Sequence, residues 1–222
     1  SLHGVNFGLA MMSVPQPILA PGAAAPLPAG NGVDLRKWTA LKASVASADF
    51  VGIEGLTISV QSLAVAINQK SGTLGNGTAA VANGLYVDFS ASAVNDGHAG
   101  TALAVKTGPA STLSLDMDGK ELLEASGNIN LGVFGFFYLN GGFAFTKTTE
   151  TVTLSDGTSK GVSLLTVGAS NVNAFAGING PYILDDNETP EDYTDDTVNA
   201  GATGLSLHGV NFGLAMMSVP QP

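Results

Sequence analysis

The sequence predicts an all-β protein with little helix, built from long kinked strands in an elongated sheet. Apolar and polar residues alternate at a period of two, and the alternation slips by one position in several places. Glycine accounts for 29 of the 222 residues, and turn-forming pairs separate the alternating runs. One stretch of sequence also occurs twice, which indicates a unit that propagates through tandem repeats in a solenoid-like or sandwich arrangement.

The slips in alternation predict kinks within strands. Along residues 205–216 the apolar positions change phase once, at His208-Gly209. Two other windows change phase in the same way, at Ser170-Asn171 and near Ser47. Because side chains of a strand alternate between faces, a slip at small polar residues predicts a β-bulge or bend. We expect three long kinked strands in equivalent positions.

Turn signals predict the remaining strands. Asp118-Gly119 and Asp156-Gly157 each lie between two alternating runs, so each predicts a hairpin with a two-residue turn. Further strands are expected at residues 55–68, 84–92 and 101–107. The total is about nine or ten strands.

The repeated stretch defines the domain organisation. The sequence SLHGVNFGLAMMSVPQP occupies residues 1–17 and recurs unchanged at 206–222, which is 205 positions later (206 minus 1). Residues 1–222 are therefore expected to be one 205-residue repeat unit plus an overlap, with a Pro/Gly-rich loop at 15–33 and an acidic loop at 185–200. Two identical strands cannot occupy one place in one fold. One copy is expected to pair where the strand of a neighbouring unit would lie, so that the sheet propagates.

Three long segments carry a resemblance to known proteins. Residues 38–69, 123–182 and 204–217 resemble the long repeats of giant bacterial surface or secreted proteins, which are adhesin-like chains. The resemblance covers most of the unit. It implies an extracellular, repetitive, β-rich scaffold, and it carries over no catalytic residues.

Composition narrows the classes of partner. The net charge is −10 and Arg36 is the single arginine, so binding to nucleic acid or to an anionic membrane surface is not expected. The chain has no cysteine, and an acidic, cysteine-free composition suits a secreted bacterial protein. Residues 125–146 carry no charge and are long enough to span a bilayer, but their period of two favours a strand over a membrane span.

The acidic loop contains the candidate metal site. Seven carboxylates fall within twelve positions, and calcium takes six to eight oxygen ligands from carboxylates and carbonyls. The alternative is a solvated acidic loop without an ion, since the EF-hand pattern is absent. The predicted calcium ligands are Asp185, Asn187, Glu188, Asp192 and Asp195.

Apolar residues of the two copies and of a phenylalanine-rich stretch are the candidate contact residues. Phe136 and Phe137 would face opposite sides of a predicted strand, so both of its faces would be apolar. A buried core, a contact between units, and a lipid or glycan groove each account for this pattern. The predicted interface residues are Leu2, Val5, Phe7, Leu9, Val210, Phe212, Leu214, Phe136 and Phe137.

These patterns favour a structural function over catalysis. The sequence has no nucleophile elbow and no phosphate loop, so an enzyme is not expected. The leading prediction is a structural repeat of a giant extracellular bacterial fibre or surface layer. It would self-associate through β-strand pairing with neighbouring copies, and parallel chains would bundle in a fibre. The alternatives are an adhesin-like module that presents loops to a glycan or partner cell, and a hydrophobic β-channel that holds lipid.

Overall fold

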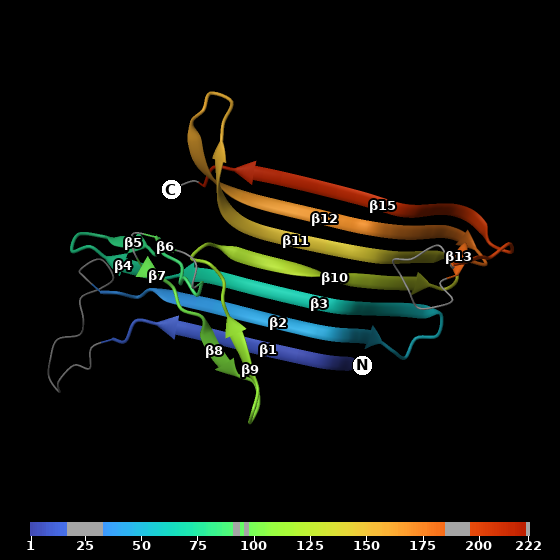
Figure 1. Ribbon diagram of the computed structural model, residues 1–222, viewed down its shortest axis with the longest axis horizontal. Helices are drawn as coiled ribbons and strands as arrows, with labels where there is room; N and C mark the ends of the chain where they lie inside the picture. Colours follow the sequence, from blue (N-terminus) through green and yellow to red (C-terminus); the bar gives the residue numbers. More distant parts are fainter. Residues whose placement is uncertain (17–32, 91–93, 96–97, 185–195, 221–222) are drawn as a thin grey trace. The chain divides into compact units, whose positions relative to one another are not determined.

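The computed structural model of the chain is all-β, as predicted, and it describes residues 1–16, 33–90, 94–95, 98–184 and 196–220. These residues contain no helix, so none of them forms an apolar helix that could cross a membrane. They form fifteen strands, which assemble into one large sheet and four two-stranded sheets (Figure 1). The number exceeds the nine or ten predicted because many strands have only two to four residues.

The large sheet is antiparallel and contains seven long strands in the order β1-β2-β3-β10-β11-β12-β15 (Figure 1). Short turns connect β2 to β3, β10 to β11 and β11 to β12, whereas longer segments separate β3 from β10 and β12 from β15. The strands are β1 (Leu2–Ser13), β2 (Lys37–Phe50), β3 (Leu56–Ser71), β10 (Leu122–Val133), β11 (Phe137–Thr153), β12 (Ser159–Ile178) and β15 (Thr203–Ser218).

The eight short strands pair as four hairpins, β4-β5, β6-β7, β8-β9 and β13-β14. The first two hairpins pair β4 (Thr73–Gly75) with β5 (Ala80–Ala82) and β6 (Val94–Asn95) with β7 (His98–Ala99). The other two pair β8 (Leu103–Lys106) with β9 (Thr112–Leu115) and β13 (Ile183–Leu184) with β14 (Thr197–Val198).

The strand predicted at 101–107 is confirmed as β8. The strand predicted at 84–92 is wrong, because residues 84–90 form no ladder. Phe89 is instead buried, and the carbonyl of Val87 accepts a hydrogen bond from the Asn68 side chain.

Of the two predicted hairpin turns, one is confirmed. β11 and β12 join through Asp156-Gly157, where the Leu154 N–H donates to the Thr158 carbonyl at 2.8 Å and Gly157 has φ +82°. The loop has three residues rather than two, as is usual for a type I turn followed by a left-handed glycine. The hairpin predicted at Asp118-Gly119 is wrong, because β9 pairs with β8 and not with β10. Gly119 does not have the positive φ that the predicted turn requires.

The slips predicted at Ser170-Asn171 and His208-Gly209 are confirmed as bulges. The β12-β15 register shifts between Ala169 and Val172 and again between Val172 and Ala174. Asn171 and Gly209 have φ values of +53° and +60° at these points. The slip predicted near Ser47 stays a prediction.

The bulges keep the apolar series of β15 on one face of the sheet, since directly opposite residues of two strands share a face. Before the bulge the apolar residues of β15 lie opposite alanines of β12, and after it they lie opposite apolar residues that range from alanine to leucine. The cross-strand pairs on this face are Leu205–Ala176, Leu207–Ala174, Val210–Val172, Phe212–Ala169, Leu214–Val167 and Met216–Leu165.

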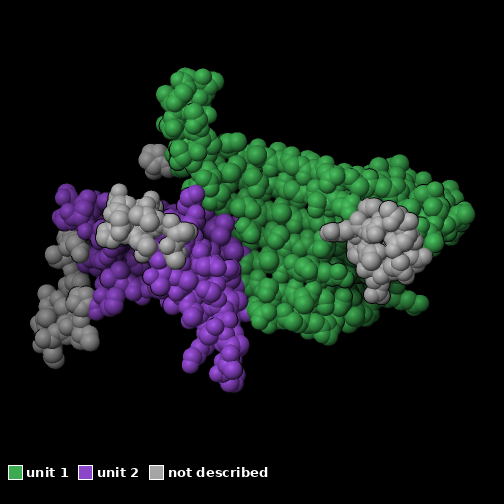
Figure 2. Space-filling model, viewed as in Figure 1, with its two compact units in different colours: residues 1–6, 43–65, 124–222 green, residues 7–42, 66–123 purple. Residues whose placement is uncertain are grey.

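The chain divides into two compact units (Figure 2). Unit 1 contains Ser1–Asn6, Ala43–Val65 and Glu124–Pro222, and unit 2 contains Phe7–Lys42 and Ala66–Leu123. Strands β1, β2 and β3 contribute residues to both units. A hydrophobic core lies in unit 2, where the buried residues are Ala40, Phe89, Leu115 and Met117. In unit 1, Val162 and Phe175 are the buried apolar residues among those described.

Candidate functional site

The two copies of the repeated sequence form the two edge strands of the large sheet, β1 and β15 (Figure 1). In an antiparallel sheet of seven strands, the first and last strands run in the same direction, as β1 and β15 do. Gly4 and Gly209, which occupy the same position in the two copies, have φ values of +61° and +60°. The same sequence thus has the same kink at both edges, while its neighbours are β2 in one case and β12 in the other.

The predicted interface residues of the two copies are exposed. On β1 the exposed fraction runs from 39% at Leu9 to 67% at Leu2, with Val5 and Phe7 between them. On β15, Val210, Phe212 and Leu214 are 39–55% exposed. These side chains therefore form apolar stripes at both edges of the sheet.

The phenylalanine-rich stretch differs from its prediction. Residues 125–146 do not form one strand, because Phe134, Gly135 and Phe136 make the turn between β10 and β11. Gly135 has φ +74°, which allows the chain to reverse. Phe136 therefore lies in a turn and only Phe137 lies on a strand. Phe134 and Phe136 are 57% and 58% exposed, so they are not core residues.

Asparagine side chains hold β15 against β12 at the bulge. Oδ1 of Asn173 accepts a hydrogen bond from the Gly209 N–H at 3.0 Å, and Oδ1 of Asn211 accepts one from the Asn171 N–H at 3.1 Å. Both donors are backbone groups at the point where the ladder shifts register. Asn211 has the same place in its copy as Asn6. The side chains thus supply partners that the interrupted ladder does not.

A groove with a volume of about 800 Å³ lies in unit 1, next to the bulge. Asparagines from three adjacent strands line it, namely Asn128 and Asn130 of β10, Asn140 of β11, and Asn171 and Asn173 of β12. Tyr138, Phe175, Tyr182 and His208 add aromatic rings. The sequence reasoning missed this groove. Repeated asparagines at alternate positions of predicted strands, where asparagine is normally depleted, are the signal that points to it.

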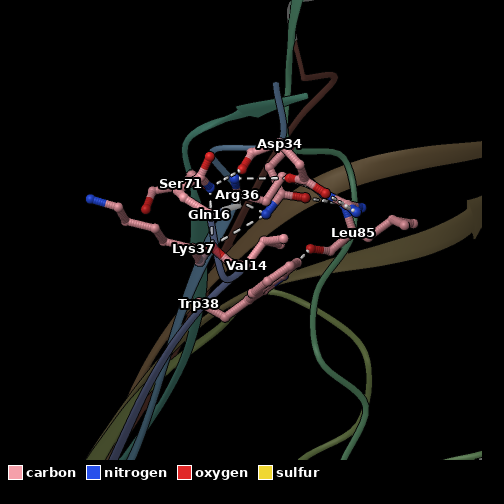
Figure 3. A network of polar contacts seen from close by, with 9 residues as sticks. Val14, Gln16, Asp34, Arg36, Lys37, Trp38, Ser71 and Leu85 are labelled. Atoms are coloured by element: carbon pink, nitrogen blue, oxygen red, sulfur yellow. Dashed lines mark hydrogen bonds and ion pairs between the residues drawn. The ribbon is translucent and has the colours of Figure 1, made fainter. Parts of the chain in front are cut away.

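Unit 2 contains a polar network around the single arginine (Figure 3). Arg36 forms two parallel hydrogen bonds with the carboxylate of Asp34, at 2.9 and 2.7 Å, and its guanidinium lies 5.5 Å from the ring centroid of Trp38. Gln16 donates to the Asp34 carbonyl, and the Trp38 indole donates to the Leu85 carbonyl. The hydrogen bond from Arg36 lowers the pKa of Asp34. The network ties the segment after β1 to the start of β2.

The candidate calcium ligands, Asp185, Asn187, Glu188, Asp192 and Asp195, lie outside the described residues, so calcium binding there stays a prediction. Within the described part of the chain, no three His, Asp or Glu side chains lie close enough together to hold a metal ion. His208 forms a 2.7 Å hydrogen bond with Ser206.

Comparison with protein-family models, with curated proteins and with solved structures found no match to this chain.

Proposed function

We propose that this chain is a structural repeat unit whose β-sheet continues from one unit into the next. The observation that supports this most strongly is the position of the two identical sequences at opposite edges of one sheet, in the same direction. Because β15 pairs with β12 and β1 pairs with β2, one copy of this strand can pair with both partners at once, one on each side. The shared strand then belongs to two units.

The geometry of such an array follows from the strand order. If β15 of one unit is β1 of the next, each unit adds six strands. Neighbouring strands lie about 4.8 Å apart, so each unit lengthens the sheet by about 29 Å. The contact joins two different edges and therefore does not close on itself, as in other head-to-tail assemblies.

The partners and location belong to the same proposal. The neighbours are further copies of the unit, and parallel chains of a fibre meet through the apolar face that carries Phe212 and Leu214. We place the array outside a bacterial cell, in a fibre or surface layer. The acidic, cysteine-free composition and the resemblance to repeats of giant surface proteins support this location.

The proposal is tested with chains of one, two and three units, each ending with residues 206–222. In a one-dimensional array the contacts between units add to stability, so the melting temperature should rise with the number of units. Small-angle scattering should show an increase in length of about 29 Å per added unit. Equal melting temperatures, together with independent flexible units in scattering, would refute a continuous sheet.

Two variants of the shared strand make the test specific. Phe212→Asp places a carboxylate on the apolar face opposite Ala169, and Ala215→Asp places one on the other face opposite Thr166. The two-unit chain with Phe212→Asp is expected to melt at the temperature of a single unit. The chain with Ala215→Asp should keep most of the gain in melting temperature.

A further inference from the structure

The groove in unit 1 has the size and lining of a small-molecule site. Its volume of about 800 Å³ falls within the range of ligand pockets. Residues of β3, β10, β11, β12 and β15 line the groove, together with the segment from Pro181 to Leu184. The lining combines amide side chains with aromatic rings, and it also includes the carboxylate of Asp196.

The amides form a ladder in which one member holds another in place. Nδ2 of Asn173 donates to Oδ1 of Asn140 at 2.9 Å, while Oδ1 of Asn173 accepts from the Gly209 N–H. Both the oxygen and the nitrogen of the Asn173 side chain therefore form hydrogen bonds within the protein. Asn140 uses its oxygen for this contact, so the two N–H groups of its own amide remain for a ligand. Asn128 and Asn130 lie two residues apart on β10 and therefore share a face that lines the groove.

The rings supply an apolar surface beside these amides. Tyr182 is 37% exposed, and its ring centroid lies 6.1 Å from that of His208. Tyr138 packs against Phe175, with the centroids 6.3 Å apart, so its ring is held in position. Each tyrosine offers a ring face and a hydroxyl that can both donate and accept.

The chemistry of this lining selects an uncharged, polyhydroxylated ligand. Among the lining residues that the structure describes, Asp196 is the one carboxylate and there is no lysine or arginine, so a phosphate or carboxylate ligand is disfavoured. A wholly apolar ligand would remove water from the amides without replacing their hydrogen bonds. A sugar ring has an apolar C–H face that packs on tyrosine and a rim of hydroxyls that pair with amides. We propose that this groove binds a neutral oligosaccharide.

The experiment titrates the 222-residue chain with cellohexaose, maltohexaose and N-acetylated chitohexaose by calorimetry, with hexagalacturonate as an anionic probe. Saturable binding of at least one neutral hexaose, and weaker binding of the anionic probe, is the expected result. If no neutral hexaose saturates the chain up to roughly 10 mM, or if hexagalacturonate binds more tightly than all three, the proposal is overturned.

Variants locate the site. Asn130→Ala and Tyr182→Ala should each weaken binding by about tenfold or more, whereas Tyr182→Phe keeps the ring and should retain most of the affinity. Thr151→Ala is the matched control, since Thr151 is exposed on β11 and does not line the groove. If Asn130→Ala and Tyr182→Ala both bind the sugar as tightly as the unmodified chain, the sugar binds elsewhere and this site is refuted. If Tyr182→Ala does not fold, unchanged affinity in Asn130→Ala and in Tyr182→Phe refutes the site. The test uses a single unit, so its outcome is independent of pairing between units.

Discussion

Gly4 and Gly209 have the same left-handed backbone conformation on the two edge strands, but their surroundings differ. A Cβ atom added to Gly4 would lie 2.7 Å from Cβ of Ala46, which is closer than real Cβ contacts allow. A Cβ atom added to Gly209 would have Asn171 Oδ1 as its nearest neighbour, at 3.9 Å. The same position of the repeat is thus packed at one edge and open at the other.

Alanine substitution should separate backbone strain from steric overlap. Gly209→Ala is expected to lower the free energy of unfolding by about 1–2 kcal/mol, because an L-residue is strained at positive φ. Gly4→Ala should cost more, since it adds an overlap with Ala46 to the same strain. Urea denaturation measures both. Gly213→Ala, in open space on β15 and without positive φ, is the control and should be neutral or stabilising. Equal losses at Gly4 and Gly213 would contradict this explanation.

Asn173→Ala should destabilise unit 1 by about 0.5–1.5 kcal/mol, because the Gly209 N–H at the exposed bulge loses its hydrogen-bond acceptor. Asn173→Asp keeps an acceptor but loses the hydrogen bond to Asn140, so its loss should be smaller. Hydrogen exchange of the Gly209 amide, followed for both variants, measures the effect locally. Asn130→Ala serves as the control in the same groove, and exchange at Gly209 should remain slow in that variant.

Asn68→Ala should cost about 3 kcal/mol in unit 2, which makes it one of the most damaging polar substitutions. Asn68 is fully buried, and its Nδ2 donates to the carbonyls of Val87 and Asp118 at 2.8 and 2.9 Å. Removal of the amide takes this hydrogen bond from the Val87 carbonyl and leaves the Asp118 carbonyl with the Lys120 N–H as its donor. Asn68→Asp preserves the volume but not the donors, so denaturant unfolding should show a loss at least as large. A stability unchanged by Asn68→Asp would mean that these bonds contribute little.

The Asp34–Arg36 pair predicts a pH-dependent contribution to stability. The pKa of Asp34 is lowered in the folded chain from its usual 3.8, so the folded state favours the carboxylate. The contribution is therefore present above the unfolded pKa and is lost as pH falls through the folded pKa. Asp34→Asn should lower the urea midpoint at about pH 7, and the difference from the unmodified chain should disappear once the pH has fallen below the folded pKa of Asp34. Glu54→Gln, at an exposed position between β2 and β3, is the control.

The sequence predicted those parts of the fold that depend on local pattern. The slips at Ser170-Asn171 and His208-Gly209 became bulges because small residues there tolerate positive φ. The failures came where tertiary contacts decided the outcome. Asp118-Gly119 has the residues of a hairpin turn, but the Asp118 carbonyl is taken by buried Asn68, and β9 pairs with β8 instead.

The candidate site was predictable only in part, for a related reason. Two identical sequences imply two equivalent strands, and residue pattern alone shows that Leu207 and Phe212 share a face. Local pattern does not show that Asn140 on β11 lies beside Asn173 on β12, since this depends on the register across the Gly141 bulge. The groove therefore could not be predicted from the sequence of any one strand, because it depends on how the strands pair.

The strand order also has a mechanical consequence. In an antiparallel sheet the hydrogen bonds between strands are perpendicular to the strands, so in the proposed array they lie along its long axis. Tension applied along that axis would load the ladder one pair of bonds at a time, and the strands would peel away in succession instead of resisting together in shear. The proposed array would therefore unfold gradually at low force and would release a long stretch of chain with each unit that unfolds. Its strands could pair again when the load is removed.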